Sequence, residues 1–249
     1  MEHRAAAVDA LALVRRFVAQ HHPDAKTALL AGSRSRGGGS PESDYDVILL
    51  FGELPNGAWR ETSVFEEQII EAFAHDCGTL AYFCREVDRP SGLPVLPTMI
   101  AEGIPILSRS PALLEDARRI AAETLQSGPP LLAPETVRER RYAITELAAA
   151  LGHHRGKGSV IAIGAALHVA LADFALRAAG RWSARSKAIP DALEAMNPVL
   201  ATQFTAAFAA LFATEDATLV LALVDSTLAP YGGQLRTGFR QVASAAWRI

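Results

Sequence analysis

The chain is short of cysteine and of net charge. Among its 249 residues there are two cysteines, Cys77 and Cys84, and the formal net charge is −3. Two cysteines are too few for a disulfide framework or a four-cysteine zinc site, and they favour a reducing cytoplasm. A small negative charge gives no general attraction to nucleic acid or to an anionic membrane. We therefore expect a cytoplasmic protein that acts on neither nucleic acids nor membranes.

Long uninterrupted hydrophobic runs are also scarce. The longest apolar run, residues 160–179, contains His168, Asp173 and Arg177, and we interpret it as a buried helix rather than a membrane span. Residues 4–20 carry charges within an amphipathic helical pattern, which is not the pattern of a signal peptide. Half of the chain is hydrophobic, so it can build a sizeable core.

The first part of the chain, to about residue 126, mixes strand and helix patterns. Gly- and Pro-bounded apolar runs predict strands, and apolar residues at helical spacing predict helices. The expected strands are 27–32, 44–51, 78–87 and 104–109, and the expected helices are 4–20, 61–76, a turn at 98–102 and one that begins at Ser110-Pro111. This mixture indicates an α+β domain over residues 1–126.

The second part of the chain shows only helical patterns. It follows a linker at residues 125–134, where Gly and Pro accumulate. Its Ala- and Leu-rich segments predict an up-and-down helical bundle over residues 135–249, with a candidate last helix in the tail. The expected helices are 135–154, 158–180, 190–212 and 215–230.

Two aspartates stand at the start of an otherwise apolar strand. Residues i and i+2 of a strand point to the same face, so Asp44 and Asp46 should lie side by side. Neighbouring carboxylates repel each other, and a divalent cation removes that cost. Magnesium suits this pair because it prefers one or two carboxylates together with phosphate oxygens.

A Gly-Ser turn precedes this pair and suits a phosphate group. Gly32 lets the backbone turn sharply, and Ser33 offers a hydroxyl and backbone amides. Arg34 and Arg36 can add positive charge nearby. The pattern predicts a site that brings a metal-bound triphosphate to two aspartates. The alternative is an ordinary turn followed by a charged strand end, since Asp-x-Asp alone is common.

Residues 32–50, GSRSRGGGSPESDYDVILL, resemble the signature of the DNA polymerase beta-like nucleotidyltransferases. The order of an αβ domain before a helical bundle is similar to the small aminoglycoside and lincosamide nucleotidyltransferases of that superfamily. The resemblance implies that Gly32 and Ser33 contact the triphosphate of ATP or another nucleotide. It further implies that Asp44 and Asp46 hold Mg²⁺ while a nucleoside monophosphate moves to a hydroxyl of a small-molecule acceptor.

The superfamily usually has a third carboxylate on the next strand, between apolar residues. The centre of the strand expected at 78–87 is Leu80-Ala81-Tyr82, which holds no acid. Asp76 and Glu86 flank this segment, and either fits only if the strand register is different. We therefore expect the third acid to be absent from this strand unless the register differs.

In some relatives the general base comes from the helical domain. The candidates here are Glu146 and Asp173, which stand among apolar residues of expected helices. A solvated helix face is the simpler interpretation for Glu146, and pairing with an arginine such as Arg177 is the simpler one for Asp173. The resemblance also makes Lys187 a candidate for the triphosphate, against the interpretation of a loop lysine.

These observations favour a Mg²⁺-dependent nucleotidyltransferase that acts on a small molecule of the aminoglycoside or lincosamide kind. Two alternatives stay open because the third acid is not evident. One is a nucleotide-binding or interaction module without catalysis, and the other is a regulator that adenylylates proteins. A nucleic-acid polymerase is disfavoured because the chain has no basic stripe.

Overall fold

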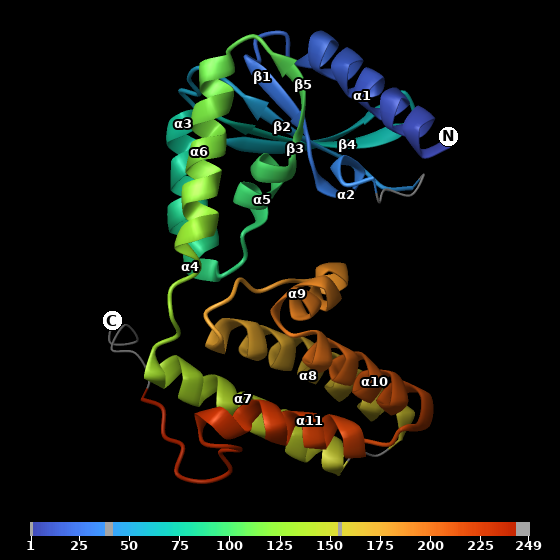
Figure 1. The fold of residues 1–249 in the computed structure, drawn as a ribbon, viewed down its shortest axis with the longest axis vertical. Coiled ribbons are helices and arrows are strands. Elements are labelled where there is room, and N and C mark those ends of the chain that lie inside the picture. The colour runs from blue at the N-terminus through green and yellow to red at the C-terminus, as the bar shows by residue number, and fades with distance from the viewer. Residues whose placement is uncertain (1, 38–41, 154–155, 243–249) are drawn as a thin grey trace, which may run out of the picture. The chain divides into compact units, whose positions relative to one another are not determined.

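The computed structural model describes residues 2–37, 42–153 and 156–242. The chain divides into two compact units, residues 1–128 and 129–249. The first unit contains a mixed sheet with flanking helices, and the described part of the second is built from helices (Figure 1). This is the α+β architecture expected from the sequence.

The first unit is organised around one five-stranded sheet with the order β3-β4-β2-β1-β5. The central pair, β2 and β4, is parallel, whereas the other neighbouring strands are antiparallel. The strands are β1 (Thr27–Leu30), β2 (Tyr45–Leu50), β3 (Trp59–Phe65), β4 (Gln68–His75) and β5 (Ile104–Ser108).

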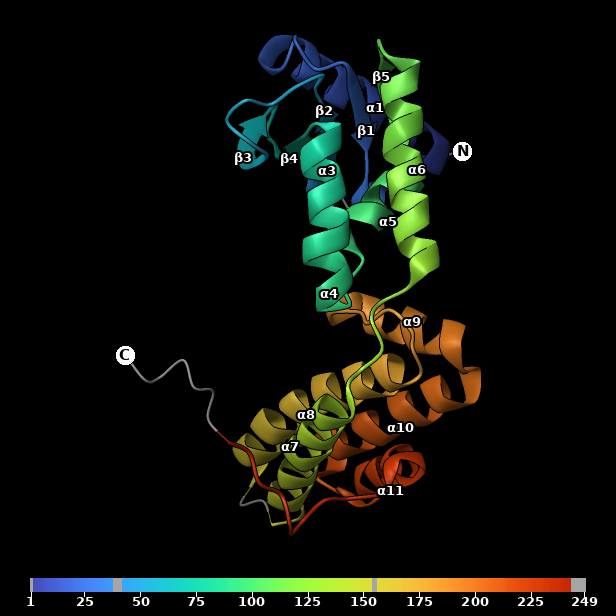
Figure 2. The same ribbon diagram turned by 90° about the vertical axis from the view of Figure 1, so that its left-hand side faces the viewer.

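Helices cover both faces of this sheet (Figures 1 and 2). Helix α1 (Glu2–His21) packs Val14 and Phe17 against one face, which includes Val47 and Leu49 of β2. The other face, with Ile48 and Leu50, packs against α3 (Cys77–Tyr82), α5 (Val95–Glu102) and α6 (Pro111–Ser127). Because β2 is buried on both faces, its apolar run carries no alternation. Its first residues, however, include the polar Asp46.

The helix expected at residues 61–76 is wrong, because this segment forms the hairpin β3–β4. Its turn is Glu66-Glu67, which joins the paired residues Phe65 and Gln68. Both glutamates have positive φ, 47° and 63°, as two-residue hairpin turns of this kind require. Such turns usually contain Gly or Asn. Arg16 compensates in part, since its guanidinium donates two hydrogen bonds to the Glu66 carboxylate at 2.8 and 2.5 Å.

The strand expected at residues 78–87 is also wrong. Asp76 caps the N-terminus of α3: its carboxylate accepts a hydrogen bond from Thr79 N at 2.7 Å, and Asp76 N donates to Thr79 Oγ1 at 3.0 Å. This reciprocal cap starts a helix that continues through a π-helical turn, Phe83–Asp88, into α4 (Arg89–Ser91). Aromatic and β-branched residues after Thr79 gave the segment its strand-like pattern.

The helix predicted to begin at Ser110-Pro111 is confirmed. Helix α6 starts at Pro111, and the Ser110 hydroxyl accepts a hydrogen bond from Leu113 N at 3.4 Å. The expected helical turn at 98–102 is the end of α5, and the short strand at 104–109 is β5.

The second unit contains α7 (Pro134–Gly152), α8 (Lys157–Ala178), α9 (Ile189–Met196), α10 (Pro198–Thr214) and α11 (Thr218–Leu228). One helix was expected over 190–212, but Asn197 ends α9 and caps α10. The Asn197 side chain accepts hydrogen bonds from Val199 N and Leu200 N, both at 3.1 Å. The tail forms no helix within residues 232–242, and residues 243–249 lie outside the described part.

Helix α8 is the one described helix that is long and apolar enough to cross a membrane by length and composition. Its side chains also form much of the core of the second unit, among them Leu167, Leu171 and Phe174. These contacts agree with the buried helix expected for residues 160–179.

Candidate functional site

The sheet topology brings the Gly-Ser turn beside the aspartates. Because β1 and β2 are antiparallel, the end of β1 lies next to the start of β2, and Leu30 pairs with Val47. One residue further, Ala31 N donates a hydrogen bond to Asp46 O at 2.8 Å. The chain then enters the short helix α2 (Gly32–Ser35). Two segments that are separated by a loop in the sequence therefore meet at Gly32 and Asp46.

Gly32 lies so close to the Asp46 carboxylate that a larger residue would have to displace it. Its φ is +67°, a conformation that favours glycine, and a Cβ at this position would lie 1.9 Å from Asp46 Oδ2 and 2.8 Å from Asp46 Cγ. The sequence predicted that Gly32 lets the backbone come close to a triphosphate. In the structure, the backbone at Gly32 comes close to the Asp46 carboxylate. It leaves room for the Asp46 side chain at the mouth of the strand.

A third carboxylate, Glu71, lies on the neighbouring strand. In the parallel pair β2–β4, Asp46 is in register with Glu71, so both side chains leave the same face of the sheet. Adjacent strands are about 4.8 Å apart, which makes these two residues direct neighbours. Asp44 lies directly before β2, and its backbone carbonyl accepts a hydrogen bond from Arg34 Nε at 3.3 Å. The sequence predicted no third acid on the strand expected at residues 78–87. The structure places a third acid, Glu71, on β4, a strand that the sequence analysis did not predict.

Arg60 holds the Glu71 carboxylate. Arg60 Nη2 lies 2.7 Å from Glu71 Oε2, and the Arg60 guanidinium also lies over the Phe73 ring, 5.0 Å from its centroid. The Glu71 side chain is 19% exposed and the Arg60 side chain 58%. The exposed Arg60 side chain orients the half-buried Glu71 carboxylate. A cation that binds Glu71 would have to compete with Arg60 for this carboxylate.

Arg34 is bound to the backbone of the aspartate segment. Its Nε donates to Ser43 O at 3.0 Å and to Asp44 O at 3.3 Å, while its guanidinium carbon lies 3.8 Å from the centre of the Tyr45 ring. These contacts position the start of β2.

Arg36 forms an exposed ion pair with Glu102 at 2.8 Å, and Ser33 is half-buried in α2. For Ser33, Arg34 and Arg36, contact with a triphosphate stays a prediction.

The acids fit a magnesium ion by their chemistry, although they do not form a closed metal cage. Within residues 2–37, 42–153 and 156–242, no three Asp, Glu, His or Cys side chains converge closely enough to hold a metal. Magnesium needs fewer protein ligands than this, since one or two carboxylates suffice when phosphate oxygens supply the others. Asp46 with Glu71 in register, and Asp44 directly before the strand, are such a donor set.

The two site residues predicted in the helical part lie in the second unit. Glu146 is exposed on α7, and Lys187 is exposed in a 3₁₀ turn, Ser186–Ala188. Their roles as general base and phosphate ligand stay predictions. Asp173 is paired with an arginine, as its simpler interpretation held. The partner is Arg140 rather than Arg177, and Ser183 Oγ donates a second hydrogen bond to Asp173 at 2.5 Å.

Sequence reasoning missed Glu71 because it assigned residues 61–76 to a helix. The signal was present as Ile69-Ile70-Glu71-Ala72, an acid between apolar residues. Asp76 and Glu86, the acids considered instead, are placed elsewhere. Asp76 caps α3 and accepts a hydrogen bond from Leu54 N at 2.9 Å, and Glu86 is exposed in the π-helical turn.

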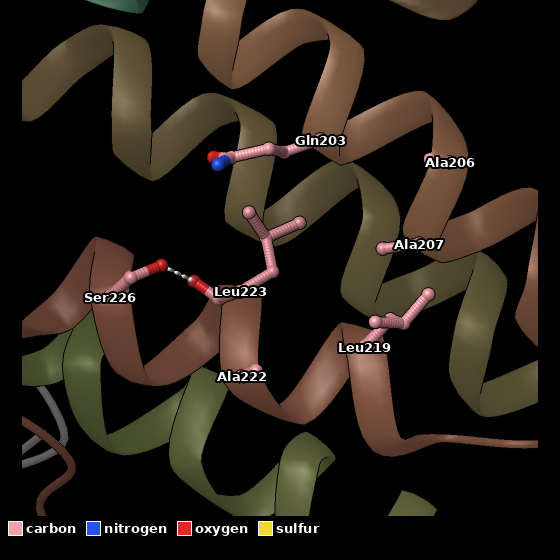
Figure 3. A pocket seen from close by; sticks show the side chains of 7 residues that line it. All are labelled: Gln203, Ala206, Ala207, Leu219, Ala222, Leu223 and Ser226. Carbon is pink, nitrogen blue, oxygen red and sulfur yellow. Dashed lines mark hydrogen bonds between the residues drawn. The ribbon is translucent and has the colours of Figure 1, made fainter.

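A groove in the second unit holds none of the predicted site residues (Figure 3). It has a volume of about 270 Å³ between α10 and α11, and it is lined by Gln203, Ala206, Ala207, Leu219, Ala222, Leu223 and Ser226. The Ser226 hydroxyl donates to Leu223 O at 3.0 Å, so its polar group is satisfied within α11. The groove offers mostly small apolar side chains and no convergent charge.

No protein-family model matches the chain, and no curated protein matches it significantly. Several solved structures do match, among them a nucleotidyltransferase-like protein from Exiguobacterium sibiricum. The two chains are 11% identical, the match covers 88% of this chain and 74% of that one, and the TM-score is 0.41. A similarity this distant carries no argument about the site, which has to be argued from this chain's own residues.

Proposed function

We propose that the chain is a Mg²⁺-dependent nucleotidyltransferase that uses ATP or another nucleoside triphosphate and acts on a hydroxyl of a small-molecule acceptor. The observation that carries the proposal is the register of Asp46 with Glu71, with Gly32 packed directly against Asp46. Two carboxylates in register, with Asp44 directly before the strand and a glycine turn beside them, favour binding of a metal-bound triphosphate over a purely structural role.

The roles of the residues follow from their positions. Asp44 and Asp46 hold the metal ion, and the turn at Gly32 and Ser33 receives the phosphates. When bound, magnesium supplies charge neutralisation at the triphosphate. Glu71, oriented by Arg60, takes the proton of the acceptor hydroxyl. The acceptor oxygen then bonds to the α-phosphorus, the bond from that phosphorus to the bridging oxygen breaks, and pyrophosphate leaves.

Label transfer tests this proposal. The full chain is incubated with Mg²⁺, ATP labelled at the α-phosphate and a panel of hydroxyl-bearing acceptors that includes aminoglycosides, lincosamides and uncharged aromatic alcohols. We expect label on an acceptor, and a loss of at least about 100-fold in rate for Asp46→Asn and for Glu71→Gln, because each removes a charge that the transition state needs.

Glu61→Gln is the matched control. Glu61 lies on β3 in register with Ala72, on the opposite face from Glu71, and pairs with His22 at 2.9 Å. Its variant should transfer label like the wild type. Transfer that survives both Asp46→Asn and Glu71→Gln would contradict the assignment of the site.

One observation favours a binding module as the second candidate. Arg60 lies 2.7 Å from one oxygen of the Glu71 carboxylate, and this ion pair competes with the binding of a cation or a proton by Glu71. If the nucleotide does not displace Arg60, the chain binds the triphosphate without transferring it. Retention of labelled ATP that depends on Mg²⁺ and Asp46, with no label on any acceptor, would favour this candidate.

A further inference from the structure

A second cavity lies beside the carboxylates, on the same face of the sheet. On β4, alternation places Phe73 and His75 on the face of Glu71. Both residues line a cavity of about 400 Å³ between the strands β3 and β4, the π-helical turn and α5. Arg60 also lines it, and the same guanidinium binds Glu71. One ion pair therefore separates this cavity, here called the β3–α5 cavity, from the proposed catalytic acids.

The walls of the β3–α5 cavity are aromatic and apolar. They come from the two strands, the π-helical turn and α5, and include the side chains of Phe73, Phe83, Val95, Leu96 and Met99. The Phe83 ring stands edge-on to the His75 imidazole, with 5.2 Å between the ring centroids. A volume near 400 Å³ falls in the range of sites that enclose small organic molecules, which is about 300–1,000 Å³.

The charged side chains of the lining are engaged with other protein groups. Arg60 is paired with Glu71. Asp88 Oδ2 accepts a hydrogen bond from Leu96 N at 2.7 Å, and burial raises the pKa of this carboxyl. His75 is 5% exposed and its Nδ1 lacks a hydrogen-bond partner. Burial lowers the pKa of His75 to about 4, so its ring is neutral near pH 7. The cavity therefore suits a ligand without charge.

Apolar side chains at the rim are unusually accessible. Phe83, Val87 and Val95 are 37%, 40% and 56% exposed, and all three line the cavity. Large apolar side chains clustered at one opening mark binding sites more often than inert surface.

We propose that the β3–α5 cavity binds an uncharged, ring-containing part of the hydroxyl-bearing acceptor. This inference rests on the proposed function and narrows it, because it names the class of acceptor. A polycation such as an aminoglycoside would meet the positive charge of Arg60 and lose its hydration there, whereas an uncharged ring system gains apolar burial and stacking. The acceptor class thereby shifts from polycationic sugars to neutral molecules with a flat, apolar portion.

Calorimetric titration of the full chain tests the inference with two probes, 2-(2-naphthyl)ethanol and kanamycin. We expect saturable binding of the naphthyl alcohol and no competition by kanamycin. Val95→Trp fills the rim of the cavity and should weaken binding of the naphthyl alcohol by about tenfold or more. Val87→Trp, at a second rim position, should do the same. The matched control is Val169→Trp on α8, where the valine is 53% exposed and lies outside the cavity.

Two results would overturn the inference: no saturable binding of the naphthyl alcohol to the wild type, or equal affinity in Val95→Trp, Val87→Trp and Val169→Trp. The same samples are titrated with Mg²⁺ and a non-hydrolysable ATP analogue, which separates this inference from the proposed function. Nucleotide binding without naphthyl binding defeats the cavity inference alone. Naphthyl binding without nucleotide binding defeats the proposed function, and with it the acceptor role of the cavity.

Discussion

At the scale of single residues, Gly32 is the position on which the proposed site depends most closely. A Cβ there would lie 1.9 Å from Asp46 Oδ2, so Gly32→Ala has to displace the carboxylate. We predict that this variant folds but binds Mg²⁺ and an ATP analogue at least about tenfold more weakly, as a lost charged contact of 1.4 kcal/mol or more would cause. Calorimetric titration measures the change.

Gly37→Ala is the control for backbone strain. Gly37 also has a positive φ, +73°, but a Cβ there meets nothing within 4 Å. Both variants bear a similar strain of about 1 kcal/mol, and only Gly32→Ala meets Asp46. An equal loss of nucleotide affinity in the two variants would show that strain, not contact with Asp46, is responsible.

His75 gives the fold a defined response to acid. Its pKa is about 4 in the folded chain against an ordinary 6.5, because burial disfavours the charged ring. Between these values the unfolded chain binds more protons, so the free energy of unfolding falls as the pH falls from 6.5 to 4. We predict that His75 lowers the free energy of unfolding of the wild type by about 2–3 kcal/mol between pH 6.5 and pH 4. His75→Gln should remove that part of the slope in urea unfolding, and an unchanged slope would contradict the assignment.

At the scale of elements, the β3–β4 hairpin places the third acid, Glu71, on a strand of the sheet. Glu67 has a φ of 63°, which is strained for a glutamate. We predict that Glu67→Gly raises the free energy of unfolding by about 0.5–1 kcal/mol, since it relieves this strain at a smaller entropic cost. Urea unfolding measures the change. Val64→Gly, at a 77% exposed position on the extended backbone of β3, should lower stability instead, and destabilisation by Glu67→Gly would refute a strained turn.

The same hairpin explains how much of the site the sequence revealed. The spacing from Gly32 to Asp44 and Asp46 was readable because a glycine turn and an apolar strand bracket it. The strand position of Glu71 could not be predicted because the preceding turn, Glu66-Glu67, contains no residue typical of turns. The conformation of this turn is stabilised by tertiary contacts such as the Arg16–Glu66 ion pair. Local propensity cannot report a contact between residues that are far apart in the chain.

Helix starts could be predicted only where the local sequence pattern around the cap was unambiguous. Ser110-Pro111 was recognised as a helix start, because both the cap and the proline act within one turn. Asp76 and Thr79 form a reciprocal cap with shorter hydrogen bonds, yet the strand-like residues that follow outweighed it in the sequence pattern. Asn197-Pro198 was overlooked inside a continuous apolar pattern, although asparagine before proline is a helix-start signal.

At the scale of the whole molecule, the chain holds separate cores. The buried residues of the helices α7–α11 form one cluster, and those of the sheet unit form two others, one on each face. We predict that Phe174→Ala, at a side chain buried in the helical core, lowers the unfolding free energy of that unit by about 3–5 kcal/mol. Hydrogen exchange should show lost protection in α8 and unchanged protection in β2. Equal losses in both would mean that the two units unfold together.

The most direct test of the central claim is a titration of Mg²⁺ with a non-hydrolysable ATP analogue into wild type, Glu71→Gln and Glu61→Gln. If Asp44, Asp46 and Glu71 form one site for a metal-bound triphosphate, wild type and Glu61→Gln bind the pair with the same affinity. Glu71→Gln, which removes one charge from the face in register with Asp46, binds it about tenfold more weakly or worse. Affinity that is the same in all three proteins, or that does not depend on Mg²⁺, would contradict the account.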